Sequence, residues 1–488
     1  MNKRNFYKWH RILGLTALVP VIFWALSGLS HPFMSNWFRP QIAKESFVPL
    51  SQSEMKPVLS IQQVMDQNHI TKLRNFGLIN FDKGTYYQVL GIDSTYNYYS
   101  ATDGSLLTDG DKNYAIYLAR YFTQDSTSKV KSLTLQTQFD INYQPINRLL
   151  PVWKVAFDRP DGMDVYVETS HSRMGTFNNN TRKTFLWIFE QFHTWDLLVQ
   201  LGGEQFRLIV LMILVSAMFL TLVSGLIVYG LYWKSFKAVQ QKRKQNGVDD
   251  KRFIHRYHRQ VGLIVSLIML FFIFSGGFHI FIQLYNIGTK IQPYQQTISR
   301  ADLNFSNLQL PVADSSIKKI SLASFDGNPF YQVTNNKKEV LYYDTNVGLE
   351  LQGGDQEYAT FLARYYSSDY NSIDSISRIN QFTNDYGFIN KRLPVQQVID
   401  GEGESLYIET TSAKLATQIT SLDRAEGLSF IFLHKFFWMT WAGKDIRDIV
   451  SMIAALGVLV VALLGFVSFI KNKYNESSLN NNLYGMRA

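Results

Sequence analysis

The chain has 488 residues, of which 46% are hydrophobic and 15% aromatic, and its mean hydropathy is close to zero, at −0.08. This balance is typical of a membrane protein with large water-exposed domains. The net charge of +9 could indicate nucleic-acid binding, but the basic residues cluster beside apolar spans, which argues against it. The absence of cysteine excludes a disulfide framework, a thiolate zinc site, an iron–sulfur cluster and covalently attached haem.

Four apolar spans are each long enough to cross about 30 Å of hydrocarbon: Leu13–Phe33, Phe206–Trp233, Val261–Leu284 and Ile449–Ile470. The first follows a basic N-terminus, but it is about twice as long as a signal-peptide core and no small-residue cleavage site follows it. We therefore expect it to be a retained transmembrane helix. Basic residues before the first span, between the second and third, and after the fourth predict that both termini and the middle loop are cytoplasmic.

The predicted fold is an α-helical transmembrane bundle, built as a tandem parallel repeat, with two α+β domains outside the cytoplasm. Its expected parts are a first span (1–33), a first outer domain (34–183), an outer-surface helix with the second span (184–233), a cytoplasmic loop (234–256), a third span (257–284), a second outer domain (285–426), an outer-surface helix with the fourth span (427–471) and a cytoplasmic tail (472–488).

Short runs of β-branched and aromatic residues between turn residues predict the strands of the outer domains. They are Tyr86–Ile92, Tyr96–Ser100, Val165–Thr169, Phe330–Thr334, Val340–Tyr343 and Leu406–Thr410, with helices predicted at Ser60–Asn68, Asn113–Thr123 and Asp355–Tyr366. Four acidic residues of the first domain are predicted to be solvated loop and strand residues rather than catalytic acids: Asp158, Asp161, Asp164 and Glu168.

The duplication is visible in the first span, because the stretch from Trp9 to His31 recurs from Tyr257 to His279 at a constant offset of 248. The matched residues include His10 with His258, Arg11 with Arg259, Gly14 with Gly262, Ser27-Gly28 with Ser275-Gly276, and His31 with His279. The outer segments repeat as well, for example Leu150-Pro151-Val152 and Leu393-Pro394-Val395. Both halves run in the same direction through the membrane, as in parallel transporter repeats.

Six of the nine histidines form three repeat-related pairs: His10/His258, His31/His279 and His193/His434. The 21 residues from His10 to His31 correspond to about 31 Å of helix, so each copy has one histidine at each membrane surface. Two neutral imidazoles from facing helices can hold a haem iron axially. The alternative is that the histidines are interfacial and are satisfied by water or lipid headgroups.

We expect two b-type haems, the first bound by His10 and His258 near the cytoplasm. In the outer layer three pairings stay open: His31/His279, His31/His193 and His279/His434. Glycines near the histidines, Gly14, Gly28, Gly262 and Gly276, could let a macrocycle approach or could serve ordinary helix packing. Arg11 and Arg259 could pair with haem propionates or act as positive-inside anchors.

The W-H-R…G…S-G-x-x-H span, its Y-H-R…G…S-G-x-x-H copy and the F-H and L-H elements before the second and fourth spans resemble the PepSY-associated transmembrane family. That family includes inner-membrane ferric-siderophore reductases with b-type haem, and each outer segment is similar to a PepSY-like periplasmic domain. The resemblance implies an oxidoreductase of the bacterial inner membrane that passes electrons to a ferric siderophore or other ferric iron.

The electron donor stays open, as a cytoplasmic reductant or a quinol, because the chain lacks the fused flavin or nicotinamide domain of some relatives. The alternative function is a non-enzymatic PepSY-domain sensor or an accessory subunit of an iron-uptake system.

Overall fold

A computed structural model describes residues 3–45, 57–232, 253–288, 291–306, 317–335, 337–367, 372–383 and 385–485, with residues 234, 237, 238, 241, 242 and 245 in between. The chain divides into two compact units. The helical unit comprises Met1–Arg39, Thr184–Thr289 and Leu422–Ala488, and the sheet unit comprises Pro40–Lys183 and Lys290–Ser421. Most of the predicted cytoplasmic loop, 234–256, lies outside the described residues.

Four helices of the described residues are long and apolar enough to cross a membrane, so the chain is a multi-pass membrane protein. They contain α2 (Leu18–Pro32) with the π-turn η1 (Phe33–Trp37), α6 (Leu197–Leu226) with η5 (Ile227–Leu231), α8 (Phe253–Tyr285) and α11 (Lys444–Gly485). Their cores overlap the four predicted spans. The predicted tail from 472 therefore begins inside α11.

The predicted first span is divided in the structure, because one residue, Ala17, separates the end of α1 (Lys3–Thr16) from the start of α2. Pro20 has no N–H to donate to the carbonyl of Thr16, so the regular helical ladder is interrupted at this point. His10 therefore lies on α1 and His31 on α2.

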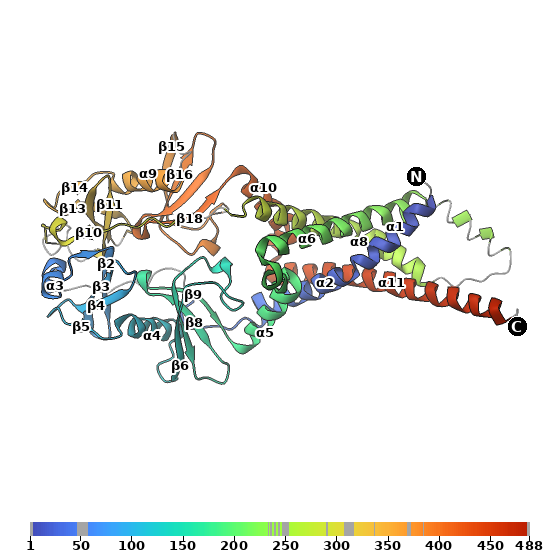
Figure 1. Ribbon diagram of the computed structural model, residues 1–488, viewed down its shortest axis with the longest axis horizontal. Helices are drawn as coiled ribbons and strands as arrows, with labels where there is room; N and C mark the ends of the chain where they lie inside the picture. The colour runs from blue at the N-terminus through green and yellow to red at the C-terminus, as the bar shows by residue number, and fades with distance from the viewer. Residues whose placement is uncertain are drawn as a thin grey trace. The chain divides into compact units, whose positions relative to one another are not determined.

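Helices α2 and α11, α8 and α11, α6 and α8, and α1 and α6 pack against each other in the helical unit, which Figure 1 shows as a bundle. Its apolar interior includes Ala17, Val21, Val265 and Val458. Large aliphatic side chains such as Ile264 lie exposed on the outer faces, as expected of helices that contact lipid.

Two short helices, whose C-terminal parts belong to the helical unit, end in π-turns that carry a histidine. The first is α5 (Asn180–Phe189) with η4 (Glu190–Thr194), and the second is α10 (Ser421–Ser429) with η11 (Phe430–His434), followed by η12 (Phe437–Ala442). They overlap the stretches predicted as outer-surface helices.

The first half of the sheet unit contains α3 (Ile61–Gln67) and two four-stranded antiparallel sheets separated by α4 (Gly110–Thr123). One sheet has the order β2 (Asn75–Phe81), β3 (Gly84–Leu90), β4 (Tyr96–Ser100), β5 (Leu106–Leu107), and the other has the order β6 (Val130–Gln136), β7 (Val152–Phe157), β8 (Asp164–Glu168), β9 (Arg173–Asn178).

The second half has the same order of elements around α9 (Gly354–Tyr366). Its sheets are β11 (Ile317–Phe325), β12 (Asn328–Asn335), β13 (Val340–Asp344), β14 (Glu350–Leu351), and β15 (Ile373–Ile379), β16 (Val395–Asp400), β17 (Ser405–Glu409), β18 (Lys414–Ile419). Each predicted strand and helix of the sheet unit overlaps an observed one, which confirms the α+β class.

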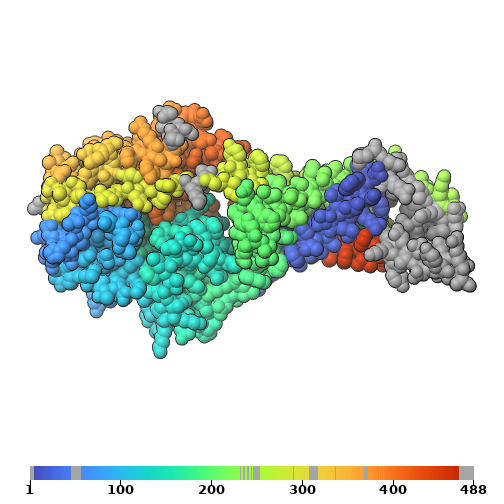
Figure 2. Space-filling view, viewed as in Figure 1, coloured from blue at the N-terminus to red at the C-terminus, as the bar shows by residue number. Residues whose placement is uncertain are grey.

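The two halves of the sheet unit share a core. Strand β1 (Lys72–Leu73) pairs antiparallel with β10 (Ile298–Ser299), and one cluster of buried side chains joins α3, β2 and β3 to β11 and β12. Figure 2 shows the same contact on the surface, where first-half residues in blue and cyan adjoin second-half residues in yellow and orange.

The prediction that Asp164 and Glu168 are solvated is wrong. Every residue of β8 is buried, and Glu168 is only 1% exposed. Asp164 pairs with Lys154 at 3.2 Å and with Lys183 at 2.7 Å, which balances its buried charge. The alternation of the sequence did not reveal this, because both faces of β8 are covered by protein.

Candidate functional site

His10 on α1 and His258 on α8 face each other, with ring centroids 6.2 Å apart. Nδ1 of His10 lies 3.0 Å from the carbonyl oxygen of Thr221, and Nδ1 of His258 lies 3.1 Å from that of Val461. A carbonyl oxygen can only accept a hydrogen bond, so each Nδ1 carries the proton and donates it. Each Nε2 therefore keeps its lone pair, which is the tautomer that binds a metal.

Each of these two rings rests on a glycine of the next helix. A Cβ atom at Gly225 would lie 2.9 Å from Cε1 of His10, and one at Gly465 would lie 3.1 Å from Cε1 of His258. Any larger residue at these positions would displace the imidazole. Each imidazole thus packs on a glycine and donates to the carbonyl oxygen one turn before that glycine. We call these two contacts the seat of the histidine.

The inner pair, His10 and His258, lines a cavity in the helical unit. Its lining includes Gly14, Gly262 and the predicted propionate partners Arg11 and Arg259. The Arg11 guanidinium also lies 4.8 Å from the centre of the Phe469 ring. The remaining glycines of the motif lie elsewhere: Gly28 is in ordinary contact with Ala455, and no other part of the described chain comes within 4 Å of a Cβ at Gly276.

A second pair forms between η4 and η11, where the ring centroids of His193 and His434 are 6.3 Å apart and the rings are nearly perpendicular, at 88°. Nδ1 of His193 lies 3.0 Å from Oγ of Ser27, and Nδ1 of His434 lies 3.1 Å from Oγ of Ser275.

The two serines of the outer pair fix the tautomers of its histidines. Ser27 donates its single hydroxyl proton to the carbonyl of Phe23 at 2.7 Å, and Ser275 donates to that of Phe271 at 2.8 Å. Each hydroxyl can then only accept from the histidine, so His193 and His434 are protonated on Nδ1 and keep a lone pair on Nε2. The motif serines of both spans therefore orient a histidine of another element.

The spacing of both pairs fits two imidazoles on opposite sides of one metal ion. With metal–nitrogen bonds of about 2.0 Å and ring nitrogens about 1.2 Å from their ring centres, the centroids would lie about 6.4 Å apart. Among the residues that the structure describes, no three His, Asp or Glu side chains gather in a way that could hold a bare ion. Two imidazoles suit an iron whose other ligands come from a porphyrin.

His31 and His279 have different surroundings. Nε2 of His31 lies 3.3 Å from the Lys435 ammonium, and Nε2 of His279 lies 2.7 Å from the Gln283 amide nitrogen. His279 also contacts Glu426 through Nδ1, at 2.7 Å. Both Nε2 atoms thus already have a hydrogen-bond donor beside them, which competes with metal binding.

One phenylalanine separates each of these histidines from the outer pair. Phe189 stacks on His193 at 4.5 Å and contacts His31 at 5.6 Å, and Phe430 stacks on His434 at 4.9 Å and contacts His279 at 5.4 Å. The structure therefore brings His193 together with His434, a pairing that is not among the three left open by the sequence.

Sequence reasoning missed the seats of the histidines. Gly225 and Gly465 are separated by 240 residues, close to the offset of 241 between His193 and His434, so the duplication contained a signal for them. Thr221 and Val461 act through their carbonyl oxygens, for which a sequence motif gives no signal.

Comparison with known proteins places part of the chain in a family. Residues 123–299, from the end of α4 to β10, match the family described as PepSY-associated TM region. Over this stretch, the match agrees with the family that the motifs of the sequence resemble. No curated protein matches the chain.

Proposed function

Since the stretch from Thr123 to Ser299 belongs to the PepSY-associated TM family, we propose that the chain is a b-type haem protein that carries electrons across the membrane to a ferric acceptor. The acceptor is a ferric siderophore or other ferric iron, which gains one electron per iron. The donor is a membrane quinol or a cytoplasmic reductant.

The observation that carries the proposal is that four histidines form two facing pairs in which, among the described residues, no hydrogen-bond donor lies beside Nε2. His10, His258, His193 and His434 each donate a hydrogen bond from Nδ1, and each ring faces an imidazole from the other half of the chain. Second-shell hydrogen bonds of this kind are the usual way in which proteins orient metal-binding histidines.

The residues around each pair have defined tasks. The inner pair would hold one haem and the outer pair a second, and a haem iron supplies one-electron redox chemistry. Arg11 and Arg259 offer cations to carboxylates at the inner cavity. Apolar side chains between the layers, Ala17, Val21 and Val265 among them, exclude water from the bundle.

The separation of the layers is shorter than the sequence suggests. His193 binds Ser27, which follows His10 by 17 residues, so the layers are about 25 Å apart along the helix rather than about 31 Å. We further propose that the two halves of the chain arose by duplication. In the orientation expected from the basic residues, the inner pair lies near the cytoplasm and the sheet unit lies in the periplasm.

The test is the haem content of the purified chain and of single histidine variants. We expect two b-type haems with bis-histidine spectra in the wild type, and one in each of His10→Ala and His193→Ala. His31→Ala should keep both, because His31 is not an axial ligand in this proposal. His69→Ala, which removes an exposed histidine of the sheet unit, is the control for nonspecific loss.

Two outcomes would contradict the proposal. A chain that stays colourless when supplied with haem would exclude electron transfer through haem and favour the non-enzymatic sensor or accessory role. A His31→Ala variant that loses a haem while His193→Ala keeps both would overturn the outer pair.

A further inference from the structure

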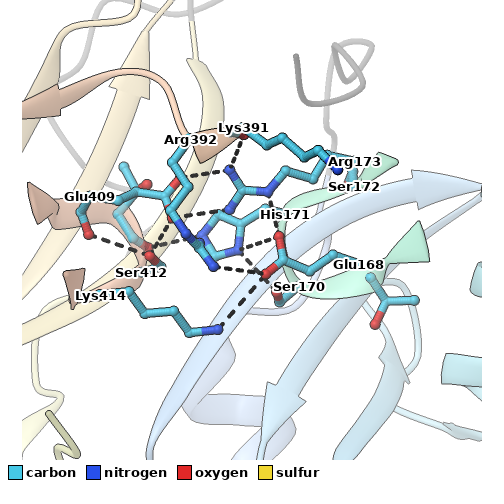
Figure 3. A network of polar contacts seen from close by, with 12 residues as sticks. Glu168, Ser170, His171, Ser172, Arg173, Lys391, Arg392, Glu409, Ser412 and Lys414 are labelled. Atoms are coloured by element: carbon cyan, nitrogen blue, oxygen red, sulfur yellow. Dashed lines mark hydrogen bonds and ion pairs between the residues drawn. The ribbon is translucent and has the colours of Figure 1, made fainter. Parts of the chain in front are cut away.

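A cluster of buried charges lies inside the sheet unit where its two halves meet (Figure 3). Arg173 of β9 is fully buried; it donates to Glu168 of β8 and, at 2.9 and 3.0 Å, to both carboxylate oxygens of Glu409 on β17. Arg392 donates to Glu409 at 2.6 Å and lies 3.8 Å from Glu168. Two carboxylates thus already have two guanidinium partners.

Three more cations belong to the same cluster, which leaves it with excess positive charge. Lys391 is buried and donates to Oδ1 of Asn147 at 2.6 Å, and Lys414 lies 3.8 Å from Glu168. Lys319 of β11 interacts electrostatically with both glutamates and with Arg173. The five cations of the cluster exceed its two carboxylates by three charges.

His171 does not add to this charge. Its burial lowers its pKa well below the usual value, and the nearby Lys319 lowers it further. The imidazole is therefore neutral, with Nδ1 3.0 Å from Oγ of Ser170 and Nε2 3.3 Å from the carbonyl oxygen of Thr411.

Lys319 differs from the other members of the cluster in the contacts of its side chain. It is partly exposed, and its ammonium group forms no hydrogen bond and no ion pair within 4 Å among the described residues. Burial lowers its pKa to about 8, and the attraction of Glu409 and Glu168 is opposed by Arg173 and Lys414. The first half of the chain has Asn75 at the matching position of its sheet, so this charge is peculiar to the second half.

The cost of a largely buried ammonium group without a direct anionic partner is relieved when the group loses its proton or when an anion binds beside it. The side chain of Lys414 is 32% exposed, and Lys319 is partly exposed as well, whereas Arg173, Arg392 and Lys391 are buried. The two lysines are therefore the part of the cluster that an ion from solution can reach. Their ammonium groups act as point charges that suit a compact oxyanion.

We propose that Lys319 and Lys414, beside His171, bind a small oxyanion, a carboxylate or phosphate group, at the junction of the two halves of the sheet unit. This site is independent of the histidine pairs of the helical unit and of the proposed electron transfer. The glutamate–arginine core lies beside the two lysines, and the anion compensates the excess charge.

The test is the unfolding temperature of the full chain in detergent, followed by tryptophan fluorescence at pH 7 during titration with sodium phosphate or sodium acetate. Sodium chloride at equal ionic strength is the reference. A ligand that binds only the folded state raises this temperature in a saturable way. In the wild type, we expect the rise in unfolding temperature to saturate with phosphate, with acetate or with both. In Lys319→Asn, which has the residue found at this position in the first half, we expect neither anion to raise the unfolding temperature more than chloride does.

Lys318→Asn is the matched control, because it removes the neighbouring charge of the same strand, and it should respond as the wild type does. The response should also weaken as the pH rises through about 8, where Lys319 loses its proton. A wild type that responds only to ionic strength, or a Lys319→Asn variant that keeps the full response, would overturn the site. Both results leave the haem proposal untouched, since haem content is measured separately.

Discussion

At the scale of single residues, hydrogen bonding distinguishes the histidines more clearly than their positions do. The sequence predicted six candidates in three matched pairs, and Nδ1 is directed at an acceptor in all six. Among the described residues, a hydrogen-bond donor lies beside Nε2 only in His31 and His279. For the four histidines of the inner and outer pairs, the acceptors are carbonyls or serines on other elements, so no local pattern could identify them. His31 and His279 have the same spacing from the motif serines but meet a lysine and a glutamine instead.

The charge of Glu168 can be tested alone. Replacing it by glutamine leaves Arg173 with one carboxylate in a fully buried site, and breaking such a pair costs about 3–5 kcal/mol. We expect Glu168→Gln to lower the free energy of unfolding of the detergent-solubilised chain by about this amount in guanidinium denaturation. Asp158→Asn, at an exposed position, should change it by no more than about 0.5 kcal/mol. Equal effects of the two variants would show that the cluster does not stabilise the fold.

At the scale of elements, the local pattern was sufficient for most of the fold. The strand predicted at Tyr96–Ser100 coincides with β4, and the helix predicted at Asp355–Tyr366 differs from α9 by one residue. Edge strands such as β6 were missed, because most of its residues are exposed and its pattern is weak. The π-turns that carry His193 and His434 were also missed, since composition does not distinguish them from α-helix.

The contact between a histidine and the glycine of the adjacent helix predicts a selective loss. In Gly225→Ala the added Cβ would lie 2.9 Å from His10, and in Gly465→Ala it would lie 3.1 Å from His258. We expect each variant to weaken haem binding at the inner pair by about 10–100-fold, as second-shell changes usually do, and to leave the outer pair filled. The measurement is a haem titration of the apoprotein.

Gly276→Ala is the control for this pair of variants, because no other part of the chain that the structure describes lies within 4 Å of its added Cβ. It should bind haem as the wild type does. Loss of the outer haem in Gly225→Ala would show that the substitution disturbs the bundle as a whole rather than the seat of His10.

At the scale of the whole chain, the two halves have kept one feature and diverged in another. Both histidine pairs take one member from each half, so neither half could form them alone. The excess of cations in the sheet unit is not shared by the two halves. Lys319 and Arg392 of the second half occupy positions at which the first half has Asn75 and Leu149. The sequence revealed the matched histidines by comparison of the halves. It could not reveal the charge cluster, because its members are far apart in the chain and become neighbours only when the halves pack together.

The orientation of the chain in the membrane can be tested directly because it contains no cysteine. We expect Ser126→Cys, at an exposed position of the sheet unit, to react with a membrane-impermeant maleimide in cells whose outer membrane has been made permeable. Gln245→Cys, between the second and third spans, should react only after the inner membrane is disrupted, because the basic residues around it favour the cytoplasm. The cysteine-free wild type gives the background. The reverse pattern would place the sheet unit in the cytoplasm, and the proposed direction of electron transfer would then be wrong even if both haems were present.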